Sequence, residues 1–113
     1  MTTISKDVSI AKKYMNKYSN ALSRKIEFTL TLADVRRLLN KKTCYYTWIK
    51  FDLQNTQTLD RIDCKKGYTK ENTVVCCDFV NALKNSLFEN ENSKIKISHK
   101  NLMKILKKLP NNY

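Results

Sequence analysis

A polar stretch in the middle of the chain holds the residues whose types and spacing could bind a metal ion. Asp60 and Asp63 lie three residues apart with Arg61 between them, Asn72 ends the stretch, and Asn81 follows nine residues later. Carboxylate and amide oxygens are the ligands that a hard cation such as Mg²⁺ prefers, and one or two of them suffice because the ion keeps several waters. The pattern therefore predicts a one-metal site with Asp60 and Asn81 as its ligands, in the layout of a nucleic-acid cutting site.

The elements that must position these residues follow from the same stretch. Gly67 is the only glycine, and we expect it to supply the positive φ of a tight reversal. Leu59–Asp63 and Thr73–Cys76 would then pair as a hairpin. A helix from about Cys77 would bring the two candidate ligands together. Asn72 is expected to hold the loop through side-chain hydrogen bonds to the backbone.

A longer set of residues in this region keeps a characteristic order and spacing. The set is Cys44, Thr47, Leu59-Asp60-Arg61-Ile62-Asp63, Gly67-Tyr68-Thr69, Asn72, Val74-Val75, Asn81 and Lys84. In this order, the segment from Cys44 to about Phe88 resembles the HNH endonucleases of phage and mobile-element genomes. The resemblance implies an α+β fold with a ββα-metal (His-Me finger) core and flanking basic helices. It also implies that Asp60, Arg61, Asn72 and Asn81 form the catalytic set, with Asp60 and Asn81 on the metal and Asn72 as the central structural residue.

Three positions depart from the pattern of that family. Arg61 stands where the wider superfamily has the histidine that activates water, and a guanidinium stays protonated and cannot act as a general base. Arginine also occurs here in the subgroup that the chain resembles, so the base stays open among Asp63, Tyr68 and a hydroxide on the metal. Trp48 replaces a turn glycine, and Cys64 replaces asparagine or serine.

The charge of the chain predicts an anionic partner. The formal net charge is +12 and the pI is near 9.7, which favours nucleic acid, here DNA. Arg61 and Lys84 are expected to neutralise the scissile phosphate. The further residues predicted to contact nucleic acid are Arg36, Arg37, Lys65 and Lys66. The chain has no apolar run long enough to span a membrane and no apolar leader, so we expect no membrane association and an intracellular location, in the cytoplasm, nucleoid or nucleus, without secretion.

The cysteines favour burial over metal binding. Cys44, Cys64, Cys76 and Cys77 contain no Cys-x-x-Cys pair, whereas structural zinc sites use pairs spaced two to four residues apart. We therefore expect small buried side chains in a reducing compartment. The expected cofactor is Mg²⁺ or Mn²⁺, not structural zinc.

The chain is expected to form one domain with three parts: a basic helical part (1–42), an HNH-like core (43–90) and a basic C-terminal helix (94–113). Ser5 to about Leu22 should be helical, with an apolar stripe of Val8, Ala11, Met15, Tyr18 and Leu22. Thr31 and Asp34 have the spacing of a capping box that starts a helix from Leu32 to about Asn40. Ser98 should cap the last helix. That helix carries the sole histidine, His99, which we expect at the surface, with a displaced general base as the alternative.

Aromatic residues gather in the segment from Cys44 to Phe51, which predicts a strand or a strand pair. Tyr45, Tyr46 and Trp48 are expected to be core residues. The alternative is that they stack on bases of nucleic acid.

Two functions follow from these observations. The first is a metal-dependent DNA endonuclease that hydrolyses or nicks phosphodiester bonds. The second is a catalytically inactive HNH-like module, such as a virus-encoded accessory or inhibitor, that binds nucleic acid or a protein partner. Position 61 distinguishes them, because loss of the base is what a non-cutting relative would show.

Overall fold

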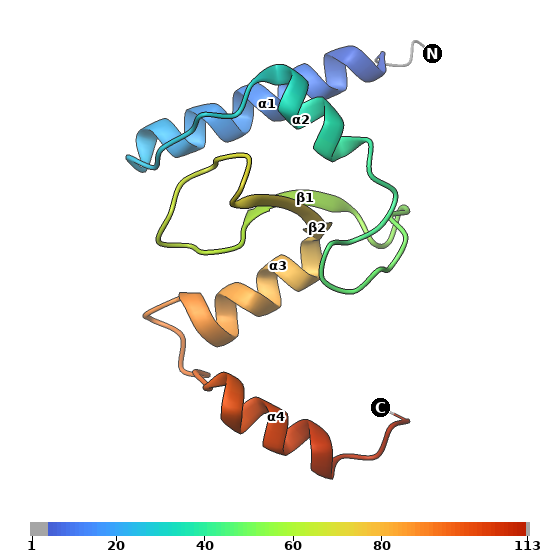
Figure 1. Cartoon of the computed structure of the whole chain (residues 1–113), viewed down its shortest axis with the longest axis vertical. Coiled ribbons are helices and arrows are strands. Elements are labelled where there is room, and N and C mark those ends of the chain that lie inside the picture. The colour runs from blue at the N-terminus through green and yellow to red at the C-terminus, as the bar shows by residue number, and fades with distance from the viewer. Residues whose placement is uncertain (1–4, 113) are drawn as a thin grey trace. The chain divides into compact units, whose positions relative to one another are not determined.

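The computed structural model describes residues 5–112, which form helices and a two-stranded sheet (Figure 1). The elements are α1 (Lys6–Ser23), α2 (Leu32–Leu39), β1 (Gln57–Arg61), β2 (Thr73–Cys77), α3 (Asp78–Lys84), a π-helical turn η1 (Asn85–Glu89) and α4 (His99–Lys108). The predicted α+β class is confirmed. The chain divides into two compact units, one ending at Asp78 and one beginning at Phe79. Within the described residues, no helix is both long and apolar enough to cross a membrane.

The two N-terminal helices begin close to the predicted positions, and side chains cap both of them. The Ser5 side chain accepts a hydrogen bond from the backbone N–H of Val8 at 3.2 Å. Thr31 and Asp34 form the expected capping box, in which each side chain accepts from the backbone N–H of the other, at 3.1 and 2.9 Å. These bonds satisfy amide groups that have no partner within a helix. α1 and α2 lie side by side (Figure 1).

The buried face of α1 differs from the predicted stripe. Ile10 and Ala21 are buried, whereas Met15 and Leu22 are exposed. The helix is rotated because its packing partners are α2 and a cluster of aromatic rings that includes Phe28, whose centroid lies 5.8 Å from that of Tyr14. The spacing of apolar residues is compatible with more than one buried face of this helix. The contacts of Phe28 determine which face is buried.

The predicted hairpin is present. β1 and β2 are antiparallel, and Asp60 pairs with Val74. The role of Gly67 is different from the prediction, because no glycine has a positive φ. A Cβ atom at Gly67 would lie 2.6 Å from both the Cβ and the carbonyl oxygen of Glu27. Glycine is therefore required where two chain segments meet, and the N–H of Tyr68 donates to the carbonyl of Glu27 at 2.8 Å at the same place.

The aromatic segment is a tight turn, not the predicted strand or strand pair. Thr43 and Lys50 form an isolated bridge, and the N–H of Trp48 donates to the carbonyl of Cys44 at 2.9 Å. Trp48 has a φ of 64°, a left-handed conformation that is strained for a bulky residue. Trp48 and Tyr45 are exposed, so the expectation that they belong to the core is wrong.

The second unit contains the rest of α3, η1 and α4. The Ser98 side chain accepts from the N–H of Asn101 at 3.2 Å and caps α4 as predicted. No residue of α4 is buried. His99 is exposed, as expected, and its ring meets that of Phe88 edge-on with centroids 4.7 Å apart.

Candidate metal and nucleic-acid site

Asp60 is a buried carboxylate on β1. Its exposure is 6%, and its Oδ2 accepts a hydrogen bond from the Tyr46 hydroxyl at 2.8 Å. Tyr46 comes from the turn that precedes β1, so the turn and the strand together orient the carboxyl group. A carboxylate is kept inside a protein only when other groups stabilise it. The Tyr46 hydroxyl is one such group, and it fixes one of the two oxygens that a metal ion would use.

Asn72 holds the loop between the two strands, as predicted. Its Oδ1 accepts from the N–H of Asp63 at 2.9 Å. Its Nδ2 donates to the carbonyls of Asp63 and Gly67 at 3.0 and 2.9 Å. The side chain is 8% exposed, and both its acceptor and its donor are used. Asn72 therefore fixes the shape of the loop that follows Asp60 and Arg61.

Arg61 is engaged by the same loop. Its Nη1 donates to the carbonyls of Cys64 and Lys66 at 2.8 and 3.0 Å. The guanidinium lies over the ring of Tyr68, 5.3 Å from the centroid, in a cation–π contact. Any contact that Arg61 makes with a phosphate must therefore coexist with, or replace, these bonds to the loop.

The two side chains considered as a general base also have structural contacts. Asp63 is exposed, and its Oδ1 accepts from the N–H of Lys65 at 2.9 Å. Tyr68 is buried, and its ring contacts Phe28 as well as Arg61. Asp63 is the more accessible of the two.

The second predicted metal ligand lies in the other unit. Asn81 is half-buried on α3, one turn before Lys84. The Nζ of Lys84 forms an ion pair with Oε2 of Glu89 at 2.8 Å. Glu89 is the last residue of η1 and is partly buried against this lysine. Lys84 could hold a phosphate only in competition with Glu89.

The other predicted phosphate contacts differ in their surroundings. Arg36 pairs with Asp7 at 3.5 Å and Arg37 with Asp34 at 3.4 Å, and all of these side chains except Asp34 are largely exposed. An open groove of about 540 Å³ runs along α2 and includes both arginines. Lys65 and Lys66 are exposed, and among residues 5–112 neither forms an ion pair. These two lysines are therefore the most readily available cations near Asp60 in the sequence.

No disulfide is present within residues 5–112, and Cys44, Cys76 and Cys77 are buried as expected, whereas Cys64 is only half-buried. Burial acts to raise the pKa of the Cys44 thiol, but hydrogen bonds from the side chain of Thr47 and from backbone N–H groups outweigh it and lower the pKa. Burial raises the pKa of Cys77. Within the part of the chain that the structure describes, no group of three or more His, Cys, Asp or Glu side chains could hold a metal ion.

Tyr46 and Thr73 are site residues that sequence reasoning missed. Tyr46 was assigned to the core, and no spacing rule pairs it with Asp60, which lies 14 positions away. Thr73 was included only as part of a strand, yet its side-chain oxygen is buried without a hydrogen-bond partner in the described structure. The one sequence signal that could have indicated a role for Tyr46 was its place in the aromatic segment from Cys44 to Phe51.

A curated viral protein is similar to most of this chain. It is the "Uncharacterized protein R423" of Acanthamoeba polyphaga mimivirus, which is 36% identical over 88 residues. The similar region covers 77% of this chain but only 16% of the viral protein. No protein-family pattern matches the chain, and no solved structure matches it.

Proposed function

We propose that the chain is a metal-dependent DNA endonuclease of the HNH type with a ββα-metal core. The observation that carries the proposal is the hairpin itself. β1 carries the buried carboxylate of Asp60, the loop after it is closed by three side-chain hydrogen bonds of Asn72, and α3 follows β2 without a linker. This order agrees with the order of motifs that the resemblance to HNH endonucleases implies.

Asp60 and Asn81 are the residues that would hold Mg²⁺ or Mn²⁺. Both offer oxygen donors, so the residue types fit a hard cation. Bound there, the ion would stabilise the charge that develops on the phosphate and on the leaving oxygen. Tyr46 would act as a positioning residue, because its hydroxyl fixes the orientation of the Asp60 carboxylate.

Exposed cations would bind the substrate around this centre. Lys65 and Lys66 project from the loop that Asn72 holds, and Arg36 and Arg37 lie on α2. Lys84 and Arg61 would approach the scissile phosphate, where the planar fork of a guanidinium can grip two oxygens. The high net positive charge favours this kind of partner.

A plasmid-nicking experiment with a charge-matched pair of variants tests the proposal. The protein is incubated with supercoiled plasmid in Mg²⁺, Mn²⁺ or EDTA, and open circles are measured. Asp60→Asn keeps the size of the side chain and an acceptor for Tyr46 but removes the carboxylate. Loss of one well-placed electrostatic group lowers a rate by roughly 100-fold or more.

The control variant is Glu71→Gln, which removes the same charge from an exposed residue of the same unit. It should nick like the wild type. Equal nicking by Asp60→Asn and wild type, at matched protein folding, would refute the assignment of Asp60.

One observation favours the second function, a non-cutting HNH-like module. Arg61 stands where a histidine base is usual, and its guanidinium is used to hold loop carbonyls and to cover Tyr68. A residue in this role stabilises the fold whether or not the site cuts. In this alternative the same surface binds nucleic acid or a protein partner without hydrolysis.

A further inference from the structure

A cavity beside the hairpin has the features of a site for a flat ring. Its volume is about 410 Å³. The residues that line it come from the end of α2, the tight turn and β2, and they include Leu38, Lys41, Tyr45, Trp48, Thr73 and Val75. All of them belong to the first unit. Cavities that bind small ligands are mostly apolar with a few polar groups that fix orientation, and this composition agrees with that pattern.

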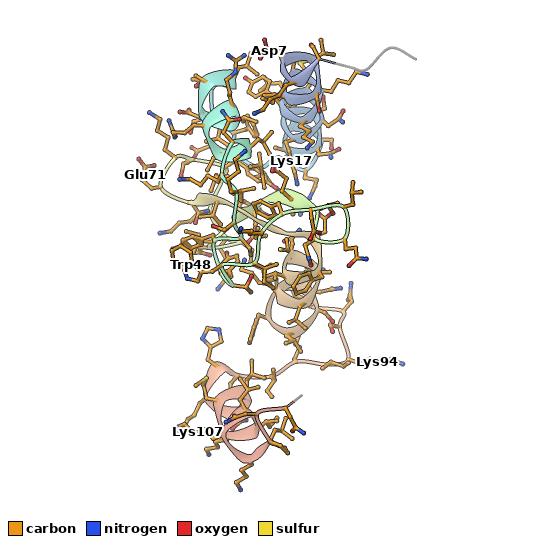
Figure 2. The ribbon with its side chains drawn as sticks, turned by 90° about the vertical axis from the view of Figure 1, so that its right-hand side faces the viewer. Asp7, Lys17, Trp48, Glu71, Lys94 and Lys107 are labelled. Carbon is orange, nitrogen blue, oxygen red and sulfur yellow. The ribbon has the colours of Figure 1, made fainter. Side chains whose placement is uncertain are left out.

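Trp48 carries two unfavourable features at once. Its side chain is 79% exposed, and its backbone has a φ of 64°, which glycine would adopt without strain. Figure 2 shows Trp48 on the left-hand side of the first unit, away from Lys17 on α1. Packing does not explain an exposed and strained tryptophan. Backbone strain of this kind is common at ligand-binding sites, where the position of a side chain is fixed for contact with the ligand.

Thr73 adds an independent polar signal. It is 3% exposed, and its Oγ1 has no hydrogen-bond partner in the described structure. A buried hydroxyl without a partner costs free energy. Thr73 is one of the residues that line the cavity, so a rotation of its buried side chain towards a bound molecule would give the hydroxyl a partner and remove that cost.

The cavity is also connected to the candidate metal ligand. Val74, which lines it, is the cross-strand partner of Asp60. The ring of Tyr45 packs edge-on against that of Tyr46, with centroids 5.1 Å apart, and Tyr46 donates to Asp60. An occupant of the cavity would therefore be placed next to the strand that carries the proposed catalytic carboxylate.

We propose that this cavity takes an unpaired base of a nucleic-acid strand, which stacks on Trp48. The base hydrogen-bonds to the Thr73 hydroxyl after the Thr73 side chain rotates towards the cavity, and Lys41, which also lines the cavity, meets the strand's phosphate. The choice of occupant rests on charge complementarity, because the chain has a net charge of +12, and on the stacking capacity of tryptophan, which suits any base. The inference rests on the nucleic-acid binding in the proposed function and specifies single-stranded or locally opened substrate.

Trp48 is the only tryptophan, so its fluorescence reports on the cavity directly. A single-stranded oligonucleotide should quench this emission in a saturable way, whereas a blunt duplex of the same sequence should quench it far less. A free nucleoside monophosphate should bind much more weakly than the strand. Equal affinity for the monophosphate would overturn the assignment to a strand, and unchanged emission at saturating oligonucleotide would overturn the site.

Two variants distinguish a loss of binding from a loss of folding, because the unfolding temperature and the Kd for a labelled oligonucleotide are measured for each. Trp48→Gly removes the ring and relieves the backbone, so the unfolding temperature should hold or rise while the Kd for single strands increases by about 10-fold or more. Thr73→Val removes the unpartnered hydroxyl at nearly constant volume, so stability should again hold or rise while the Kd increases by a few-fold. Trp48→Phe retains a stacking ring and should lose less affinity than Trp48→Gly.

The matched control is Leu53→Ala, because Leu53 is 98% exposed and does not line the cavity. Its Kd should equal that of the wild type. If Trp48→Gly binds single strands as tightly as the wild type while the wild type binds and nicks duplex, the base site is wrong and the proposed function stands. If the wild type binds neither single-stranded nor double-stranded DNA, both are wrong.

Discussion

At the scale of single residues, Arg61 decides between the two proposed functions. Its Nη1 holds two loop carbonyls and its guanidinium covers Tyr68. Loss of these contacts in Arg61→Ala should destabilise the fold by about 1–3 kcal/mol. That cost can be measured by urea unfolding, and activities of variants at this position must be compared at matched fractions of folded protein.

Arg61→His is the sharper test. If the site is a nuclease that has lost its base, the imidazole should create or increase metal-dependent nicking, with a rise around a pH of about 6.5. If Arg61 is an adapted catalytic residue, the same change should lower nicking. The double variant Asp60→Asn/Arg61→His is the control, because any gained activity that needs the metal should vanish in it. A wild type that never nicks, beside an Arg61→His variant that does, would favour the binding module.

At the scale of elements, the capping box of α2 makes stability depend on pH. The N–H of Thr31 donates to the Asp34 carboxylate and is the main cause that lowers its pKa, with smaller contributions from Lys70 and Arg37, while burial opposes them. The pKa is lower in the folded chain than in the unfolded chain, where it is about 3.9. The stabilisation is therefore complete above that pH and is lost as the pH falls through the folded-state value.

The prediction is that wild type and Asp34→Asn differ most in urea midpoint near pH 6, and that the difference shrinks as the pH falls towards 2.5. Asp7→Asn serves as the control, because Asp7 has one exposed ion pair, with Arg36, and exposed pairs contribute little. A difference between wild type and Asp34→Asn that stays constant with pH would contradict the assigned role of the carboxylate.

The elements also show what the sequence could predict. Thr31 with Asp34, and Ser98, cap their helices where expected, because a cap is a local pattern of three or four residues. The hairpin was predicted from a reversal at Gly67, and it is present although that glycine has no positive φ. The predicted bonds of Asn72 stay within the loop between the two strands. The tight turn at Trp48 was missed, because aromatic residues favour strands and a left-handed tryptophan breaks that preference.

Contacts between distant segments could not be predicted. Gly67 was expected to supply a positive φ, but its requirement comes from Glu27, 40 positions earlier in the chain. The bond from Tyr46 to Asp60 and the unpartnered hydroxyl of Thr73 likewise depend on how the turn packs on the hairpin. Spacing rules describe neighbours on one element, and these contacts join several.

At the scale of the whole molecule, the distribution of charge predicts how binding responds to salt. A protein that neutralises phosphates releases counterions, so log Kobs should fall linearly with log salt concentration, with a slope of about −0.9 for each phosphate contacted in B-DNA. Cations already paired with carboxylates, such as Arg36 with Asp7, must give up that ion pair when they contact a phosphate. They therefore contribute less to the binding free energy. Lys65 and Lys66 are exposed, and in the described part of the chain neither has an ion-pair partner.

These two lysines should therefore account for a measurable part of the slope. Lys65→Gln and Lys66→Gln should each make the slope less steep by about 0.9 on a random duplex, and the double variant by about twice that. Glu71→Gln, in the same region, should leave the slope unchanged because a carboxylate contacts no phosphate. Anisotropy titrations between low and physiological salt give the slopes. An affinity that does not change with salt would exclude nucleic acid as the main partner, and with it both the nuclease and the base site, because each depends on a strand held by its phosphates.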